Sequence, residues 1–120
     1  MQVQWQNTTK TVVQQTFEAG WTEEEYKQTL LKSLEMVRNQ DHNVHLVADM
    51  TAPTLTMTKF PLVFTKVQVD LPENLGYVVV ANGNRFMAMT RMVKTLYPRL
   101  ESQLRFVETK DEAYQFLADL

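Results

Sequence analysis

Two short apolar runs, "VHLVADM" at 44–50 and "YVVVA" at 77–81, limit this chain to a small group of folds. Each run is rich in β-branched residues and long enough for one strand, as is typical of strands buried on both faces of a parallel sheet. Parallel strands need long crossover connections, which are usually helices. Helical patterns surround both runs, so we predict strands that alternate with helices.

The clearest helical pattern covers residues 22–38. Thr22 and Glu25 match a capping box, in which each residue satisfies a backbone N–H of the other. The residues that follow place one apolar stripe on the helix, formed by Tyr26, Leu30, Ser33, Leu34 and Val37. We therefore predict a helix packed on the sheet.

Three further helices are predicted with less uniform patterns. Residues 59–72 fit both a helix and two broken strand alternations, and Pro61, which suits the first turn of a helix, favours the helix. Residues 85–97 carry an apolar stripe that ends near Pro98. Thr109 is placed to cap a final helix that buries Ala113, Phe116 and Leu117.

The remaining strand signals complete the predicted fold. Val3 and Trp5 alternate with glutamines, turn residues follow, and 11–17 is again rich in strand formers, which indicates a hairpin. "LRFVET" at 104–109 predicts one more short strand. We predict a single α/β domain of 120 residues, with a small mixed five-stranded sheet, an opening antiparallel hairpin and about four helices.

Composition excludes several classes of function. The chain has no cysteine, so thiol catalysis, thiolate metal sites and disulfides are absent. His42 and His45 are three residues apart on an extended segment and point to opposite faces, so we expect neither a metal nor a cofactor. The net charge of −2 disfavours nucleic acid as a partner, and no apolar run approaches the length of a membrane span. We expect a cytoplasmic protein.

Taken together, the hairpin, the "WTEE" helix start at 21–24, "VHLVADMT", "NLGYVVVANG" and "FVETKDEAYQFL" resemble the SpoIIAA-like branch of the STAS fold. That family is named for anti-sigma-factor antagonists and is structurally similar to the CRAL-TRIO lipid-binding domains. The resemblance implies a regulatory or protein-interaction domain, with lipid binding as an alternative. In the antagonists an Asp at the end of a strand is followed by a phosphorylated Ser or Thr, then Ser and Gly. Here Asp49 is followed by Met50, Thr51, Ala52 and Pro53, so the motif is not matched and we expect the switch to be missing.

A candidate binding site follows from the predicted sheet, because open α/β sheets bind ligands at the carboxyl ends of their strands. Segments 49–54, 82–85 and 108–110 would meet there. An anion could be held by the helix start after Asn82 and by a cationic side chain. The candidate residues of this loop site are Asp49, Thr51, Thr54, Asn82, Asn84 and Arg85. Ordinary turn and cap roles explain the same residues.

Asp49 has no catalytic partner in the pattern. His45 shares its strand face, but four residues along a strand span about 13 Å, too far for a hydrogen-bonded acid–base pair. We expect Asp49 to accept backbone N–H bonds from the turn that follows it. No other nucleophile and base can be paired from spacing, so we do not expect an enzyme.

Methionines suggest two kinds of contact. Met87 falls outside the apolar stripe of the 85–97 helix, near Arg91 and Lys94, where adaptable thioethers are common at protein interfaces. This surface, with the 49–54 loop, gives the first hypothesis: a non-enzymatic interaction domain and a possible homodimer. The second hypothesis is a carrier or sensor of a small apolar or anionic ligand, with peripheral lipid contact possible. Its pocket would be lined by Met50, Met57, Phe60 and Phe64.

Overall fold

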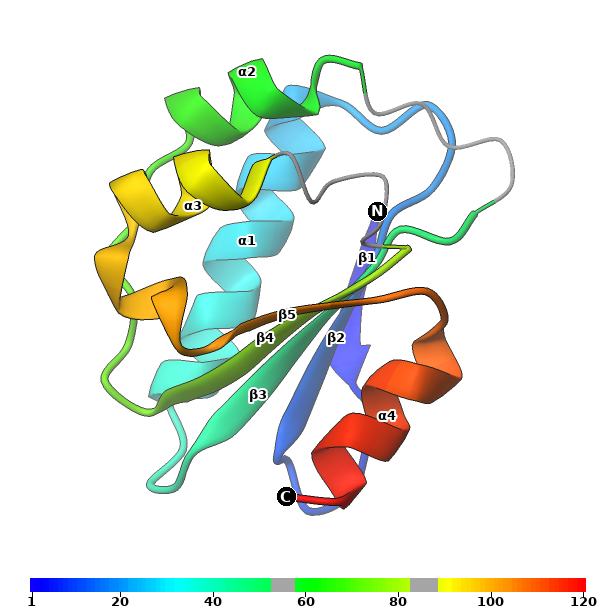
Figure 1. The fold of residues 1–120 in the computed structure, drawn as a ribbon, viewed down its shortest axis with the longest axis vertical. Coiled ribbons are helices and arrows are strands. Elements are labelled where there is room, and N and C mark those ends of the chain that lie inside the picture. The colour runs from blue at the N-terminus through cyan, green and yellow to red at the C-terminus, as the bar shows by residue number, and fades with distance from the viewer. Residues whose placement is uncertain (53–57, 83–88) are drawn as a thin grey trace.

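The computed structural model describes residues 1–52, 58–82 and 89–120. Five strands form one sheet in the order β1-β2-β3-β4-β5 (Figure 1). β1 pairs antiparallel with β2, and the other neighbours pair in parallel. The strands are β1 Gln2–Trp5, β2 Val12–Thr16, β3 Val44–Asp49, β4 Leu75–Ala81 and β5 Leu104–Val107. The predicted mixed sheet with its opening hairpin is confirmed.

The helices lie on both faces of this sheet. α1, α2 and α3 cover one face and α4 covers the other (Figure 1). Their bounds are α1 Glu23–Arg38, α2 Phe60–Lys66, α3 Thr90–Leu96 and α4 Lys110–Ala118, with a 3-10 turn, η2, at Pro98–Glu101. The ambiguous segment around Pro61 is therefore helical. The described part of the predicted 85–97 helix begins only at Thr90, and 83–88 lie outside the described residues.

Local capping fixes where two helices begin. The hydroxyl of Thr22 accepts a 3.1 Å bond from the N–H of Glu25, whose carboxylate accepts the N–H of Thr22 at 3.2 Å. Thr109 accepts the N–H of Glu112 at 3.1 Å in the same way at the start of α4. Both predicted caps are confirmed, and each satisfies N–H groups that the first helical turn leaves without a partner.

The central strands are buried on both faces, as expected for parallel strands between helix layers. In β3, Leu46 and Ala48 point toward α1, whereas Val47 points toward α4 and packs with Val79 and Ala113. Every β3 residue except His45 is buried. Alternation along one strand therefore supplies both cores of the molecule.

The three helices on this face of the sheet, α1, α2 and α3, differ in how closely their backbones approach the strands. α1 approaches β1, β2 and β3 closely along its length, whereas the short helices α2 and α3 make few close backbone approaches to the sheet. Large side chains fill most of the space beneath them, including Phe60 and Phe64 from α2 and Val93 from α3. Within the described ranges, no helix combines the length and the apolar content that crossing a bilayer requires.

Candidate functional site

The carboxyl ends of the parallel strands bring together the described parts of all three predicted loop segments. The backbone N–H of Asn82 donates to the carbonyl of Glu108 at 3.1 Å, and its side-chain amide donates to the carbonyl of Met50 at 3.0 Å. Asn82 has a φ of 66°, a left-handed conformation that Asn tolerates better than most residues. Thr54, Asn84 and Arg85 lie outside the described residues. The described side chains at this edge therefore join loops to one another.

Asp49 is buried at this edge, and the hydrogen bonds of its carboxylate stay within the protein. Oδ1 accepts the backbone N–H of Thr51 at 3.0 Å and the Thr51 hydroxyl at 2.5 Å. Oδ2 lies 3.8 Å from Nζ of Lys110 on α4. As expected, Asp49 accepts a backbone bond from the turn that follows it. Tyr114 lies on α4. Burial raises the pKa of its phenol, and the negative charges of Asp49 and Asp111 raise it further.

His45 and Asp49 have separate partners, in agreement with their expected distance along the strand. Nδ1 of His45 accepts the backbone N–H of Tyr77 at 2.9 Å, and burial lowers the pKa of this imidazole. His42 instead lies outside the sheet, between Asp41 and the carbonyl of Lys10. Among the residues that the structure describes, no three His, Asp or Glu side chains are arranged to hold a metal ion.

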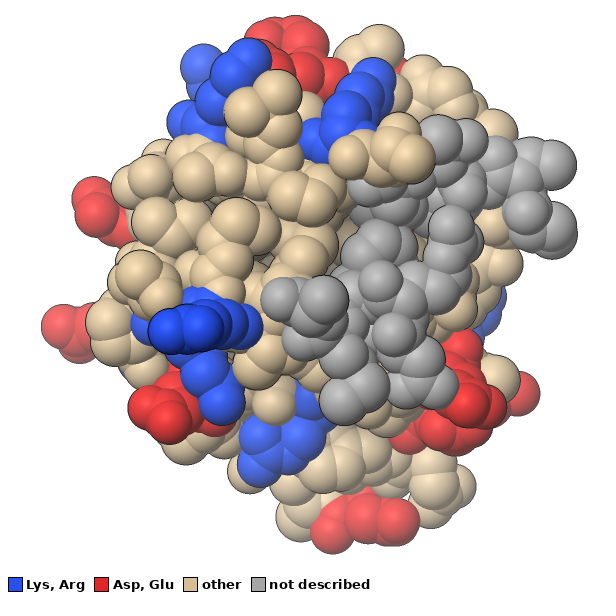
Figure 2. Space-filling view, turned by 45° about the horizontal axis from the view of Figure 1, so that its top comes forward, with Lys and Arg blue, Asp and Glu red and all other residues tan. Residues whose placement is uncertain are grey.

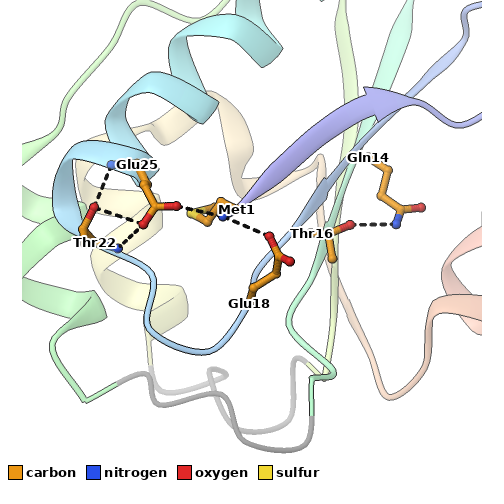
Figure 3. A network of polar contacts seen from close by, with 6 residues as sticks. All are labelled: Met1, Gln14, Thr16, Glu18, Thr22 and Glu25. Atoms are coloured by element: carbon orange, nitrogen blue, oxygen red, sulfur yellow. Dashed lines mark hydrogen bonds and ion pairs between the residues drawn. The ribbon is translucent and has the colours of Figure 1, made fainter.

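A second polar network ties the first residue to the start of α1 (Figure 3). The α-amino group of Met1 lies 3.1 Å from the carboxylate of Glu18 and 3.0 Å from that of Glu25. Burial lowers the pKa of this amine, but the hydrogen bonds that it donates to Glu25 and Glu18, with the negative charges of these residues, outweigh burial and the pKa is raised overall. On the other side of β2, the amide of Gln14 donates to the hydroxyl of Thr16 at 3.0 Å. The sequence patterns did not indicate either contact.

The predicted interaction surface is only partly described. Arg91 is exposed on α3, Lys94 is half-buried, and Met87 lies outside the described residues. Uncharged side chains form much of the surface over α2 and α3, interrupted by a few cations (Figure 2). Leu62 on α2 is 61% exposed and is one of the large apolar side chains that reach solvent. Sequence reasoning had assigned no role to Leu62.

An apolar cavity of about 120 Å³ lies between the sheet and the three helices α1, α2 and α3. Its wall combines strand side chains that point toward α1 with the inner faces of the helices. Met50, Phe60 and Phe64, three of the four side chains expected to line a pocket, are part of this wall. The fourth, Met57, lies outside the described residues.

Aromatic side chains build the two ends of the cavity. At one end, Phe60 contacts Phe17, Trp21 and Tyr26, with ring centroids between 5.4 and 6.0 Å apart. Phe64 then stands 5.9 Å from Phe60 and 5.9 Å from Tyr97. Edge-on and tilted rings at these distances attract one another. Ring contacts therefore link five aromatic side chains of the cavity lining: Phe17, Tyr26, Phe60, Phe64 and Tyr97.

Three polar side chains interrupt the apolar wall: Gln15, Tyr26 and Tyr97. The amide nitrogen of Gln15 donates to the Ser33 hydroxyl at 2.9 Å. The hydroxyl of Tyr97 accepts the backbone N–H of Val69 at 3.1 Å. Tyr26 is 5% exposed, and burial, followed by the nearby phenol of Tyr97, raises its pKa. These groups are one amide and two phenols, and no Asp, Glu, Lys or Arg is among the described residues that line the cavity.

Comparison with known proteins does not assign this chain to a family. No family model, curated protein or solved structure gave a significant match. The resemblance to SpoIIAA-like proteins therefore rests on the sequence motifs alone, and the site is interpreted from its own chemistry.

Proposed function

We propose that this protein binds a small apolar molecule in the cavity beneath α2 and α3, as a carrier or a sensor. The observation that carries the proposal is an almost wholly apolar cavity of about 120 Å³ inside a chain of only 120 residues. Protein interiors are close-packed, and an empty space of this size forfeits dispersion contacts. An apolar ligand would restore those contacts with the carbon and sulfur atoms of the wall.

The size of the cavity limits the ligand class. An engineered apolar cavity of about 150 Å³ in another protein stays dry and binds benzene, so a space of about 120 Å³ suits a single ring or a short branched chain. Sites for larger ligands enclose about 300–1,000 Å³. A long lipid chain would therefore require α2 and α3 to move away from the sheet. Their short length and sparse approach to the strands make that movement cheaper than a movement of α1.

Titration with toluene tests this proposal directly. We expect toluene to shift the methyl NMR signals of Val78 and Val93 on the cavity wall, and to leave those of Val12, on the α4 face, unchanged. Ala48 also lines the cavity, so Ala48→Leu should fill it and weaken binding by about tenfold or more, equivalent to ~1.4 kcal/mol. Ala19→Leu, at an exposed position, is the matched control. An absence of saturable binding to the unmodified protein would refute the proposal.

A second candidate function is a protein-interaction domain that uses the surface of α2 and α3. The sequence resemblance favours it, and the 61% exposure of Leu62 on a largely uncharged surface supports it (Figure 2). Arg91 and Lys94 would supply polar contacts at the rim. Native mass spectrometry tests the homodimer form of this idea: a dimer that Leu62→Lys converts to a monomer supports it, and a dimer indifferent to that change removes this surface from consideration.

A further inference from the structure

Some polar groups of the cavity wall make no hydrogen bond to the described residues of the protein. Tyr26 lies on the wall and is 5% exposed, yet its hydroxyl makes no hydrogen bond within the part of the chain that the structure describes. Among the described residues, every side-chain nitrogen or oxygen that is sealed from water has a hydrogen-bond partner, so the Tyr26 hydroxyl, which has none, must face a free space. The cavity is a free space that Tyr26 lines. The hydroxyl of Tyr26 is therefore positioned to bond something that enters the cavity.

Tyr97 and Gln15 have bonding capacity left over in the same space. The Tyr97 hydroxyl accepts one N–H, from Val69, and its own hydrogen has no acceptor among the described residues. Gln15 uses its amide nitrogen on Ser33, while its carbonyl oxygen has no donor within the described ranges. The described part of the wall thus offers hydroxyl donors and a carbonyl acceptor among side chains that are otherwise apolar.

The same wall excludes charge. A carboxylate or phosphate in the cavity would have to give up its hydration, and neither Lys nor Arg is among the described lining residues that could replace that hydration. Burial keeps the Tyr26 phenol in its neutral, hydrogen-donating form. A neutral oxygen on an apolar body is the chemistry that matches these groups.

We infer that the cavity selects a neutral, ring-sized molecule that carries an oxygen, and that the hydroxyl of Tyr26 binds this oxygen. Simple phenols, aromatic alcohols and small ketones belong to this class. The inference rests on the proposed function and goes beyond it, because a purely apolar site would accept a hydrocarbon and reject its hydroxylated analogue.

Phenol and toluene provide the test, since phenol has a hydroxyl where toluene has a methyl group. We would measure the dissociation constants of both for the unmodified protein and for Tyr26→Phe, which removes only the unpaired hydroxyl. Tyr26→Phe should weaken phenol about tenfold or more, the effect expected for losing a hydrogen bond to a desolvated group, and should leave toluene within about twofold. Tyr77→Phe removes a phenol hydroxyl on the α4 face and is the matched control for both ligands.

Each outcome bears on a different statement. If Tyr26→Phe leaves the ratio of the phenol and toluene constants unchanged while toluene still binds, the inference is overturned and the proposed function stands. If benzoate binds the unmodified protein at pH 7 as tightly as phenol, selection for a neutral ligand is refuted. If toluene and phenol both fail to bind, the proposed function falls and the inference falls with it.

Discussion

The backbone N–H of Tyr77 donates a 2.9 Å hydrogen bond to Nδ1 of His45, so a side chain replaces a ladder carbonyl between β3 and β4. Val44 pairs with Leu75, but Leu46 pairs with Val78, which leaves Gly76 and Tyr77 opposite the single residue His45. This is a β-bulge, in which the additional residue would lack a partner. The imidazole supplies that partner and holds the two central strands in register beyond the bulge.

Gly76 is the position where this arrangement tolerates no side chain. A Cβ at Gly76 would lie 2.4 Å from Nδ1 and 2.6 Å from Cε1 of His45. We expect Gly76→Ala to lower the free energy of unfolding by about 1–3 kcal/mol, the usual range for an overpacked site, as measured by denaturant unfolding. The same change in a His45→Ala background should be much less harmful, because the clashing ring is gone. An equal loss in both backgrounds would contradict this origin.

The bulge also makes stability depend on pH. Burial lowers the pKa of His45 below the value of about 6.5 that it has in the unfolded chain, and protonation would abolish the acceptor for Tyr77. The unfolded state therefore binds more protons in the window between the two pKa values, and stability rises with pH there. The contribution is complete above about pH 6.5 and is lost as pH falls through the folded pKa.

His42 titrates in the opposite sense, and this separates the two residues experimentally. Its hydrogen bond to the carbonyl of Lys10, with the carboxylate of Asp41, raises its pKa, so its contribution is present at low pH and is lost as pH rises. NMR titration should give a lower pKa for His45 than for His42. His45→Gln should flatten the fall in stability between pH 7 and the folded pKa. A slope unchanged by His45→Gln would show that other groups cause it.

Asn74 joins α1 to the loop that leads into β3. Its amide nitrogen donates to the carbonyls of Val37 at 2.6 Å, Gln40 at 3.2 Å and His42 at 3.0 Å. Asn74→Asp would face these three acceptors with a carboxylate, so we expect a loss of about 1–3 kcal/mol in thermal or denaturant unfolding. Asn43→Asp changes the same atoms at an exposed site and should have little effect. Equal losses would point to net charge as the cause.

These contacts show where sequence reasoning succeeded and where it could not. Strands, caps and the hairpin were predictable because their signals lie within a few residues, as Thr22 and Glu25 do. The bulge at His45 and the contact of Asn74 with Val37 join residues 32 and 37 positions apart, and no local period encodes them. Tyr26 was correctly placed on the inner stripe of its helix, but an unpaired hydroxyl becomes visible only when the opposite wall is known. The role of Asp49 as an acceptor for the following turn was predictable because its partner Thr51 is two residues away.

Asp49 stabilises the edge of the sheet by satisfying the turn that follows it. Asp49→Ala removes both bonds to Thr51 and the ion pair with Lys110, so we expect a loss of about 1.5–3 kcal/mol, as for hydrogen bonds to a charged group. Asp70→Ala, at an exposed carboxylate, is the control in the same unfolding experiment. If the two variants were equally stable, Asp49 would be free of a structural role, and a chemical role would need to be sought.

The two faces of the sheet should respond differently to the same enlargement. Ala48 lines the cavity on the α1 face, whereas Ala113 is fully buried against the opposite face. Ala113→Leu overpacks a filled core and should cost about 1–3 kcal/mol, while Ala48→Leu adds carbon to an existing space and should cost less than about 1 kcal/mol. Denaturant unfolding of both variants measures the difference. A cost at Ala48 as large as that at Ala113 would mean that the α1 face is already filled in solution, and the ligand site would be lost with it.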